Sequence, residues 1–236
     1  MKKLIVAAAL VCGVVSIDLL ADGVAEAKGQ AYHFQARRLL NKHDEVAALK
    51  GKTVGLVMIG DSITDFWESF HRDAWKKFNS KRLSLNLGYA ADLTQHTIWR
   101  LENGELDGYK AKVVTIMIGT NNNTSDKTKP EDVAEGVKRI VAIVREKQPK
   151  AKIILHAIFP RGNSAASDHA RARARNDKTN ELLKEFAEKD GKIVWLDLTK
   201  ELTDETGWVP KDIMEDQLHP TAKGYQIWER ALKPLL

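Results

Sequence analysis

The clearest pattern along the chain is an alternation of short apolar runs with longer amphipathic stretches. The runs, mostly apolar and rich in β-branched residues, are 54–59, 83–87, 112–118, 152–159 and 192–198. Runs this short, without regular polar alternation, are typical of strands buried on both faces. The stretches between them have helical spacing, and residues 133–144 place their valines and isoleucines on one face. The pattern therefore predicts an α/β fold with a parallel sheet and helices on both sides.

The N-terminus does not fit this alternation. A basic start, an apolar run over residues 4–15 and the small-x-small triplet 25–27 predict a secretory signal peptide covering residues 1–27. An uncleaved membrane anchor is the alternative, but Asp18 interrupts the run before the roughly 18 apolar residues that a span requires. We expect one domain, 28–236, that is secreted or periplasmic and has no stable membrane anchor after cleavage. Its first part is expected to be a helix leading into the first strand.

Composition narrows the possible functions. The only cysteine, Cys12, lies in the predicted signal peptide, so the mature chain would have no disulfide, thiol nucleophile or cysteine-ligated metal. The net charge is +5, and the arginines of residues 171–175 do not form one helical stripe, so we expect no nucleic-acid partner. Metal-ligand spacing, the dinucleotide glycine fingerprint and the phosphate-loop motif do not occur, so no metal or other cofactor is expected.

Polar side chains follow the predicted strands where a ligand site belongs. In a parallel sheet, ligands bind outside the carboxyl ends of the strands. Gly-Asp-Ser at 60–62 follows the first run, the turn 88–92 follows the second, and Gly-Thr-Asn-Asn at 119–122 follows the third. Asp-Gln-Leu-His-Pro at 216–220 lies in the loop after the fifth. The sequence therefore predicts that a serine, an asparagine, an aspartate and a histidine meet at one edge of the sheet.

These residue types suit acyl transfer. Ser62 becomes a nucleophile when a base takes its proton, which His219 can do, and Asp216 can hold the imidazole in one tautomer. The Ser62 N–H, a backbone N–H of the turn 88–91 and the Asn121 side chain are candidate donors to an oxyanion. Each motif alone also fits a helix cap or a turn. Their joint placement after three strands favours catalysis.

Two further histidines lie near the predicted sheet. His156 falls inside the fourth run and is expected to be a core histidine with its hydrogen bonds satisfied. His96 follows the second loop and could approach the site.

The segments GDSIT, NLGYAAD, GTNN and DQLHP, in this order and at these intervals, resemble the four sequence blocks of the GDSL, or SGNH, hydrolases. The resemblance covers residues 54–232. It is closest to the branch that contains the catalytic subunits of platelet-activating-factor acetylhydrolase. It implies a flavodoxin-like three-layer α/β/α sandwich with five parallel strands, and a carboxylic ester hydrolase that needs no cofactor.

The resemblance also implies roles for individual residues. Ser62 would be the nucleophile and the first oxyanion donor, Asn121 the side-chain donor, His219 the base and Asp216 its orienter. The family usually has a second glycine as backbone donor, and that position is Ala91 here. Either this turn needs no positive φ, or the donor is displaced. Ile63, Thr120 and Leu218 would line a small acyl pocket, and Gly88 would fill the earlier glycine position beside it.

The most consistent function is a secreted serine esterase that removes short acyl groups, acetyl above all, from a small-molecule or glycan ester such as an O-acetylated carbohydrate. A lysophospholipase or thioesterase of the same family is the alternative within this class. A catalytically silent carbohydrate-binding protein on the same scaffold is the alternative outside it, and Ala91 is the one feature in its favour. The sequence does not indicate an oligomeric state.

Overall fold

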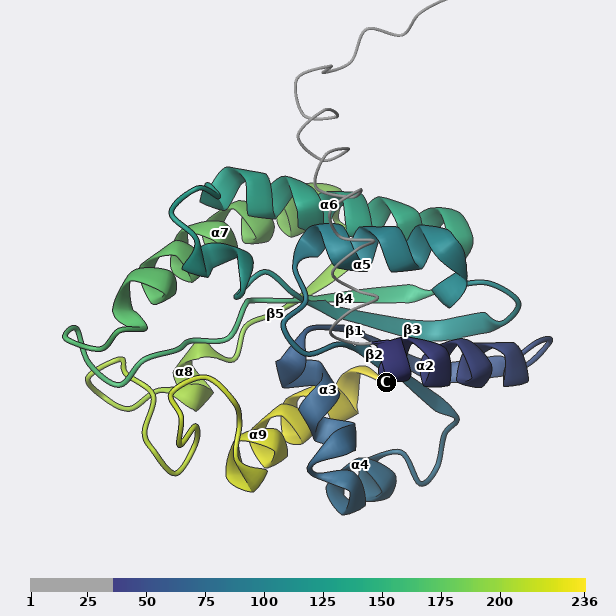
Figure 1. The fold of residues 1–236 in the computed structure, drawn as a ribbon, viewed down its shortest axis with the longest axis horizontal. Helices are drawn as coiled ribbons and strands as arrows, with labels where there is room; N and C mark the ends of the chain where they lie inside the picture. Colours follow the sequence, from purple (N-terminus) through teal and green to yellow (C-terminus); the bar gives the residue numbers. More distant parts are fainter. Residues whose placement is uncertain (1–35) are drawn as a thin grey trace, which may run out of the picture.

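The computed structural model describes residues 36–236, so the predicted signal peptide lies outside the described residues. Five strands alternate with helices along the chain (Figure 1). The elements are α2 (Ala36–Ala48), β1 (Thr53–Gly60), α3 (Ser62–Ser69), α4 (Arg72–Phe78), β2 (Ser84–Gly88), α5 (Thr94–Arg100), η1 (Leu101–Glu105), β3 (Lys110–Met117), η2 (Asn122–Thr124), α6 (Pro130–Lys147), β4 (Lys152–His156), α7 (Ala170–Asp190), β5 (Ile193–Leu196), α8 (Thr199–Leu202), α9 (Ala222–Leu232) and η3 (Lys233–Leu235).

The strands form one parallel sheet in the order β2-β1-β3-β4-β5, which confirms the predicted fold class. Each of the five predicted runs overlaps one strand, but the fourth and fifth runs extend past the ends of β4 and β5. Beyond β4, the Asn180 side chain of α7 bonds both the N–H and the C=O of Ile158, in place of a neighbouring strand.

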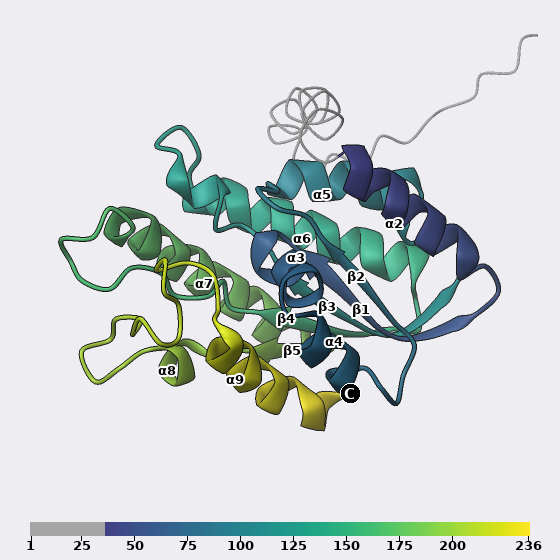
Figure 2. The same ribbon diagram turned by 60° about the horizontal axis from the view of Figure 1, so that its bottom comes forward.

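Helices cover both faces of the sheet, and the sandwich has two apolar cores (Figures 1 and 2). On one face, side chains such as Val57 and Ile59 of β1 pack with residues from α2, α5, α6 and α7. On the other face, Leu56 and Met58 pack with residues from α3, α4, α8 and α9. Alternate residues of one strand thus serve opposite cores, which explains the unbroken apolar runs.

Two glycines at strand ends let α3 lie close to the sheet. Gly60 ends β1 and pairs with Gly88 at the end of β2. A Cβ on Gly60 would lie 2.1 Å from Thr64 Oγ1, and one on Gly88 would lie 2.4 Å from the backbone nitrogen of Asp65. Any larger residue would push the first turn of α3, and with it Ser62, away from the strand ends.

The expectation for His156 was half wrong. The side chain is buried at the end of β4, as expected, but neither ring nitrogen has a hydrogen-bond partner in the described part of the chain. Its ring instead forms edge-to-face pairs with Phe159 and Trp228. Burial lowers the pKa of His156 to about 3, so the ring stays neutral. The aromatic packing makes it a core side chain without the polar network that the residue type suggested.

Candidate active site

The structure brings Ser62, His219 and Asp216 into one hydrogen-bonded line. Ser62 Oγ lies 2.9 Å from His219 Nε2, and His219 Nδ1 lies 2.5 Å from Asp216 Oδ2. Ser62 is the first residue of α3, whereas the other two lie in the turn before α9, and His219 is 157 positions away along the chain. An ionised Asp216 accepts a hydrogen bond from the His219 Nδ1–H, and this tautomer leaves the Nε2 lone pair facing the serine hydroxyl.

Asp216 is held by the backbone of its own turn. Its Oδ1 accepts hydrogen bonds from the N–H groups of Leu218 at 3.0 Å and His219 at 2.7 Å. Burial alone would raise the pKa of Asp216, but the hydrogen bonds from His219 and Leu218 outweigh it and hold the pKa below its ordinary value. Asp216 therefore stays ionised across the neutral range.

Ser62 owes its position to the cap of α3. Asp61 Oδ1 accepts the Ile63 N–H at 3.0 Å, so Asp61 closes the N-terminus of the helix. The Ser62 N–H is one of the helix's unpaired first-turn donors, at the positive end of the helix dipole. The helix cap, Asp61, and the predicted nucleophile, Ser62, thus lie in the same short turn.

The cap carries an unusual carboxylate. Asp61 is fully buried, and its Oδ2 has no hydrogen-bond partner among the described residues. Burial raises the pKa of Asp61 to about 7, although the Ile63 N–H and the charge of Arg161 favour the ionised form. The pKa of Asp61 is therefore raised and that of Asp216 lowered within one site.

The turn after β2 presents the predicted backbone donor. Ala91 has φ 63°, so the turn does require the left-handed conformation, and this chain adopts it with an alanine. Such backbone costs an alanine roughly 1–2 kcal/mol. No group in residues 36–236 accepts a hydrogen bond from the N–H of Ala91 or of Ser62, so both remain available to a ligand.

Buried ion pairs hold the turn 88–92 in place. Asp92 accepts hydrogen bonds from Arg100 and, at 3.0 Å, from the Thr97 hydroxyl. Arg100 also pairs with Glu105, which accepts the Tyr89 hydroxyl hydrogen bond. The Arg100 guanidinium lies 3.7 Å from the centre of the Tyr89 ring. Tyr89 and Asp92, which flank Ala90 and Ala91, are therefore both held by the Arg100 guanidinium.

Asn121 joins the same assembly. Its Nδ2 donates to the Asp92 carbonyl at 2.9 Å. An amide nitrogen carries two hydrogens, so one fixes the side chain and the other remains for a ligand. The Ser62 N–H, the Ala91 N–H and the Asn121 amide thus come from three different strand ends, as the motif positions predicted.

The other predicted site residues are more enclosed. Ile63 and Gly88 are buried, and Leu218 packs partly against the core on the α9 side. The Thr120 hydroxyl accepts hydrogen bonds from Arg161 and Asn176. Contact of these residues with a substrate stays a prediction.

His96 lies close to the oxyanion turn but serves α5. Its Nδ1 accepts the Leu93 N–H at 3.1 Å, and it lies 3.8 Å from Asp92 Oδ1. This closes the N-terminal turn of the helix. His96 therefore supports the turn from behind, and we assign it no contact with the reacting atoms.

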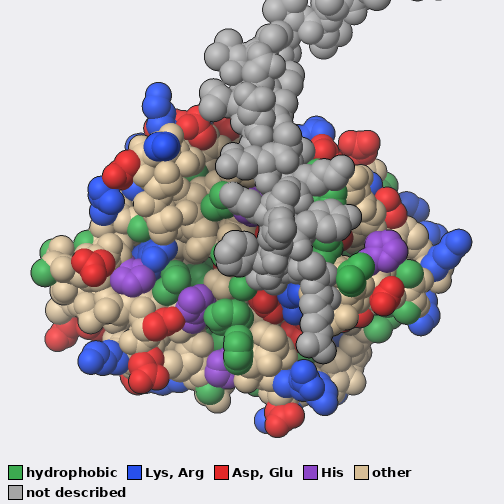
Figure 3. All heavy atoms as spheres, in the orientation of Figure 1, with side chains coloured by type: hydrophobic (Ala, Val, Ile, Leu, Met, Phe, Trp, Pro, Cys, Tyr) green, Lys and Arg blue, Asp and Glu red, His purple; other side chains and the backbone are tan. Residues whose placement is uncertain are grey.

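Sequence reasoning missed an aromatic neighbour of the catalytic histidine. The Phe66 ring lies 4.8 Å from the His219 ring, and Phe70 meets Phe66 edge to face at 4.6 Å. Phe70 is 72% exposed, and Figure 3 shows hydrophobic side chains beside histidines over α3. The signal was present, since Ser62, Phe66 and Phe70 recur every four residues and so share a helix face.

The comparisons identify the family. The model of the GDSL-like lipase/acylhydrolase family matches residues 58–227. The chain belongs to this family. It is therefore a carboxylic ester hydrolase, and the predicted resemblance is confirmed.

Relatives and solved structures agree with this assignment. The chain is 33% identical over 199 residues to platelet-activating factor acetylhydrolase IB subunit alpha2 of Rattus norvegicus, covering 84% of this chain and 82% of the relative. It is 34% identical over 194 residues to subunit alpha1 of Bos taurus, covering 82% and 80%. A GDSL-like lipase from Bacteroides thetaiotaomicron shares the fold with a TM-score of 0.70 at 20% identity, covering 84% and 96%.

The described residues contain no group of three or more histidine, cysteine, aspartate or glutamate side chains that could hold a metal ion. None of the helices over residues 36–236 is long and apolar enough to cross a membrane.

Proposed function

We propose that this GDSL-family hydrolase is a serine esterase that cleaves short acyl esters through Ser62, His219 and Asp216. The observation that carries the proposal is the continuous hydrogen-bonded line from Ser62 Oγ through His219 to Asp216. Three available donors near the serine, on residues 62, 91 and 121, supply the second requirement, which is charge stabilisation of an oxyanion.

The first half of the reaction follows from this geometry. Ser62 Oγ attacks the ester carbonyl carbon while its proton passes to His219 Nε2, and Asp216 stabilises the imidazolium that results. The carbonyl oxygen becomes an oxyanion and accepts hydrogen bonds from the Ser62 N–H, the Ala91 N–H and Asn121. The carbon–oxygen bond then breaks, the Nε2 proton goes to the departing alcohol, and the acyl group stays on Ser62.

In the second half, water replaces the alcohol. His219 takes a proton from the water, whose oxygen attacks the acyl carbon, and Ser62 Oγ leaves with the proton returned by His219. Products are one carboxylic acid and a restored enzyme, so no cofactor is consumed. The alcohol must stand next to His219 when it leaves. Phe66 and Phe70, which lie beside that ring, are therefore the side chains that we expect the alcohol part to contact.

We propose acetyl or a similarly short group as the acyl part. The relatives named above are acetylhydrolases, and Ile63 and Thr120, two of the residues predicted to surround the acyl group, are buried. For the alcohol part we propose a carbohydrate or another small molecule, since an exposed phenylalanine offers a flat apolar face to a sugar ring. A lysophospholipid or a thioester is the competing substrate.

We also propose that the enzyme acts outside the cytoplasm, on the strength of the leader-like residues 1–27. N-terminal sequencing of the protein recovered from the source cells tests this. A mature protein that begins at residue 28 supports export, and an intact N-terminus in the cytoplasm contradicts it.

A chain-length series tests the proposed function. Initial rates on p-nitrophenyl acetate, butyrate and octanoate, and acid release from acetylated xylan and a lysophospholipid, are measured for wild type and Ser62→Ala. We expect the acetate to be fastest and the variant to lose the activity. A preference for octanoate or lysophospholipid would overturn the short-acyl proposal, and equal rates for wild type and variant would overturn the esterase and favour the silent binding protein.

A further inference from the structure

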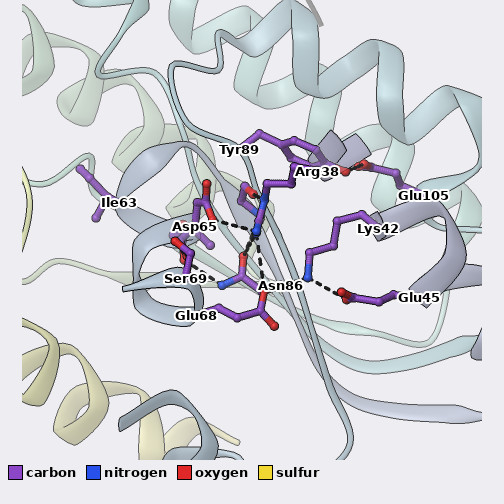
Figure 4. A network of polar contacts seen from close by, with 12 residues as sticks. Arg38, Lys42, Glu45, Ile63, Asp65, Glu68, Ser69, Asn86, Tyr89 and Glu105 are labelled. Atoms are coloured by element: carbon purple, nitrogen blue, oxygen red, sulfur yellow. Dashed lines mark hydrogen bonds and ion pairs between the residues drawn. The ribbon is translucent and has the colours of Figure 1, made fainter. Parts of the chain in front are cut away.

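Arg38 of the N-terminal helix reaches the elements that carry two of the oxyanion donors. Its Nε donates to the Gly88 carbonyl at 2.7 Å, and its Nη1 lies 2.8 Å from Asp65 Oδ1 (Figure 4). Its Nη2 lies 3.4 Å from Asn86 Oδ1 and 3.6 Å from Glu68 Oε2. The side chain is only 17% exposed. All three nitrogens of one guanidinium are thus directed at two neighbouring elements.

The two elements are the first turns of α3 and the end of β2. Asp65 lies one turn after Ser62, and Gly88 lies three residues before Ala91. Asn86 ties the same elements together from the strand side, since its Nδ2 donates to the Thr64 carbonyl at 2.8 Å and its Oδ1 accepts the Gly88 N–H at 2.8 Å. The spacing between α3 and β2 sets the spacing between the Ser62 and Ala91 N–H groups.

We propose that Arg38 is a positioning residue for the oxyanion hole, which it assembles by holding the Ser62 end of α3 against the β2 end that leads to Ala91. The proposal rests on the proposed function for the role of the two donors. It adds a requirement that the family match does not include, because that match begins at residue 58 and α2 ends at residue 48.

The Asp65 carboxylate extends the link to the turn itself. Burial raises the pKa of Asp65, while the Arg38 charge, the Ser69 hydroxyl and the Ala90 backbone N–H favour its ionised form. The Asp65 carboxylate thus contacts the Ala90 N–H as well as Arg38. Arg38 also lies over the Tyr89 ring, 5.4 Å from its centre. Because left-handed backbone at Ala91 is unfavourable, such outside contacts are what keep the turn in place.

An arginine suits this position better than a lysine. The contacts to Gly88 and Asp65 use separate nitrogens of one planar fork, and a single ammonium group cannot reproduce that geometry. Arg38→Lys should therefore keep the charge but lose part of the positioning.

Lys42 provides a matched control on the same helix. Its side chain is 2% exposed, and its Nζ lies 2.7 Å from both Glu45 and Glu68. Like Arg38, it joins α2 to α3, but within residues 36–236 it has no hydrogen bond or ion pair to β2 or the turn 88–92 (Figure 4). If docking of α2 were all that matters, the two variants would behave alike.

The test compares Arg38→Met with Lys42→Met on p-nitrophenyl acetate, below the melting temperature of each. We expect Arg38→Met to lower kcat about 10- to 100-fold with KM changed less than about threefold, since misplacing a transition-state donor affects kcat. We expect Lys42→Met to keep kcat within about twofold and Arg38→Lys to be intermediate. Affinity for an aryl boronic acid, which forms a tetrahedral adduct on a serine, should fall in parallel with kcat.

Wild-type kcat in Arg38→Met, or equal losses in both methionine variants, would overturn the proposal. If Arg38→Met does not fold, the comparison of Arg38→Lys with Lys42→Met gives the same decision. Amide hydrogen exchange of residues 88–92 provides a readout that does not depend on activity. Faster exchange in Arg38→Met than in Lys42→Met supports the positioning role even if wild type fails as an esterase, and equal exchange contradicts it.

Discussion

Two turns of the site contain a non-glycine residue with positive φ, Ala91 at 63° and Gln217 at 66°. Ala91 lies in the oxyanion turn, residues 88–92, and Gln217 lies between the two polar members of the triad turn, residues 216–219. The triad turn directs His219 at Ser62, and the oxyanion turn carries the predicted donor Ala91, yet the structure supports the two turns by opposite means.

The oxyanion turn is supported by buried ion pairs. Asp92, Arg100 and Glu105 are 8% exposed or less, and their ion pairs are out of contact with water. The triad turn is held by backbone instead. The Asp216 side chain is 55% exposed, and the Gln217 carbonyl accepts the Gly162 N–H at 2.9 Å.

Because of this difference in burial, we expect charged residues of the oxyanion turn to matter mainly for stability and Asp216 to matter mainly for catalysis. Removing one partner from a buried ion pair leaves an uncompensated charge and is strongly destabilising, whereas an exposed carboxylate contributes little to folding. The same carboxylate-to-amide change should therefore destabilise the fold in one turn and slow the reaction in the other.

The largest effect is expected from Asp216→Asn. An asparagine amide favours the tautomer with the proton on His219 Nε2, which cannot accept the Ser62 proton, so kcat should fall by about 10³- to 10⁴-fold with little change in melting temperature. Esterase kinetics and a thermal melt measure both. Asp212→Asn, which removes an exposed partner of Lys223 in the same loop, is the control and should keep its activity. A loss below about tenfold for Asp216→Asn would contradict the role of Asp216.

The converse is expected from Asp92→Asn. Arg100 would keep Glu105 but lose its other buried partner, so the free energy of unfolding should fall by about 3 kcal/mol or more. Urea denaturation at neutral pH measures this. Asp107→Asn removes an exposed partner of Lys147 and should cost less than about 1 kcal/mol. Equal costs for the two variants would show that burial of the network does not matter.

A third substitution examines the buried cap between the two turns. Because the pKa of Asp61 is about 7 in the folded protein and near 4 when unfolded, the folded state binds the extra proton between these values, and stability should fall as pH rises through that window. Asp61→Asn keeps a capping oxygen without the charge. We expect it to be more stable than wild type by on the order of 2 kcal/mol at pH 8, with the gain gone near pH 4. A gain independent of pH would contradict this account.

The smallest effects concern the left-handed residues themselves. Glycine relieves roughly 1–2 kcal/mol of strain but adds about 0.4–1 kcal/mol of unfolded-chain entropy. Ala91→Gly and Gln217→Gly should each raise the melting temperature by a few degrees at most. The conformation belongs to the turn in both places, so neither variant should lose activity. Destabilisation by either glycine would show that the side chain, through contacts such as Ser167 Oγ to Gln217 Oε1, matters more than the backbone.

The sheet and the meeting of Ser62, Asn121, Asp216 and His219 could be predicted because both follow from local pattern. Apolar runs mark buried strands, and parallel strands end at one edge. The ion pairs beside Ala91, the contacts of Arg38 and the lack of a hydrogen-bond partner for His156 within residues 36–236 could not be predicted. Each depends on which distant side chains fill a given space. The sequence left open whether the turn at Ala91 needs positive φ, and the structure shows that it does, with φ 63°.

The central claim is that Ser62 carries the acyl group during turnover. The direct measurement is mass spectrometry of wild-type protein quenched in acid during hydrolysis of p-nitrophenyl acetate, with peptide mapping of the adduct. The account predicts an acetyl group on Ser62 that disappears when substrate is exhausted and never forms in Ser62→Ala. Turnover with the acetyl group on another residue, or undiminished turnover in Ser62→Ala, would contradict it.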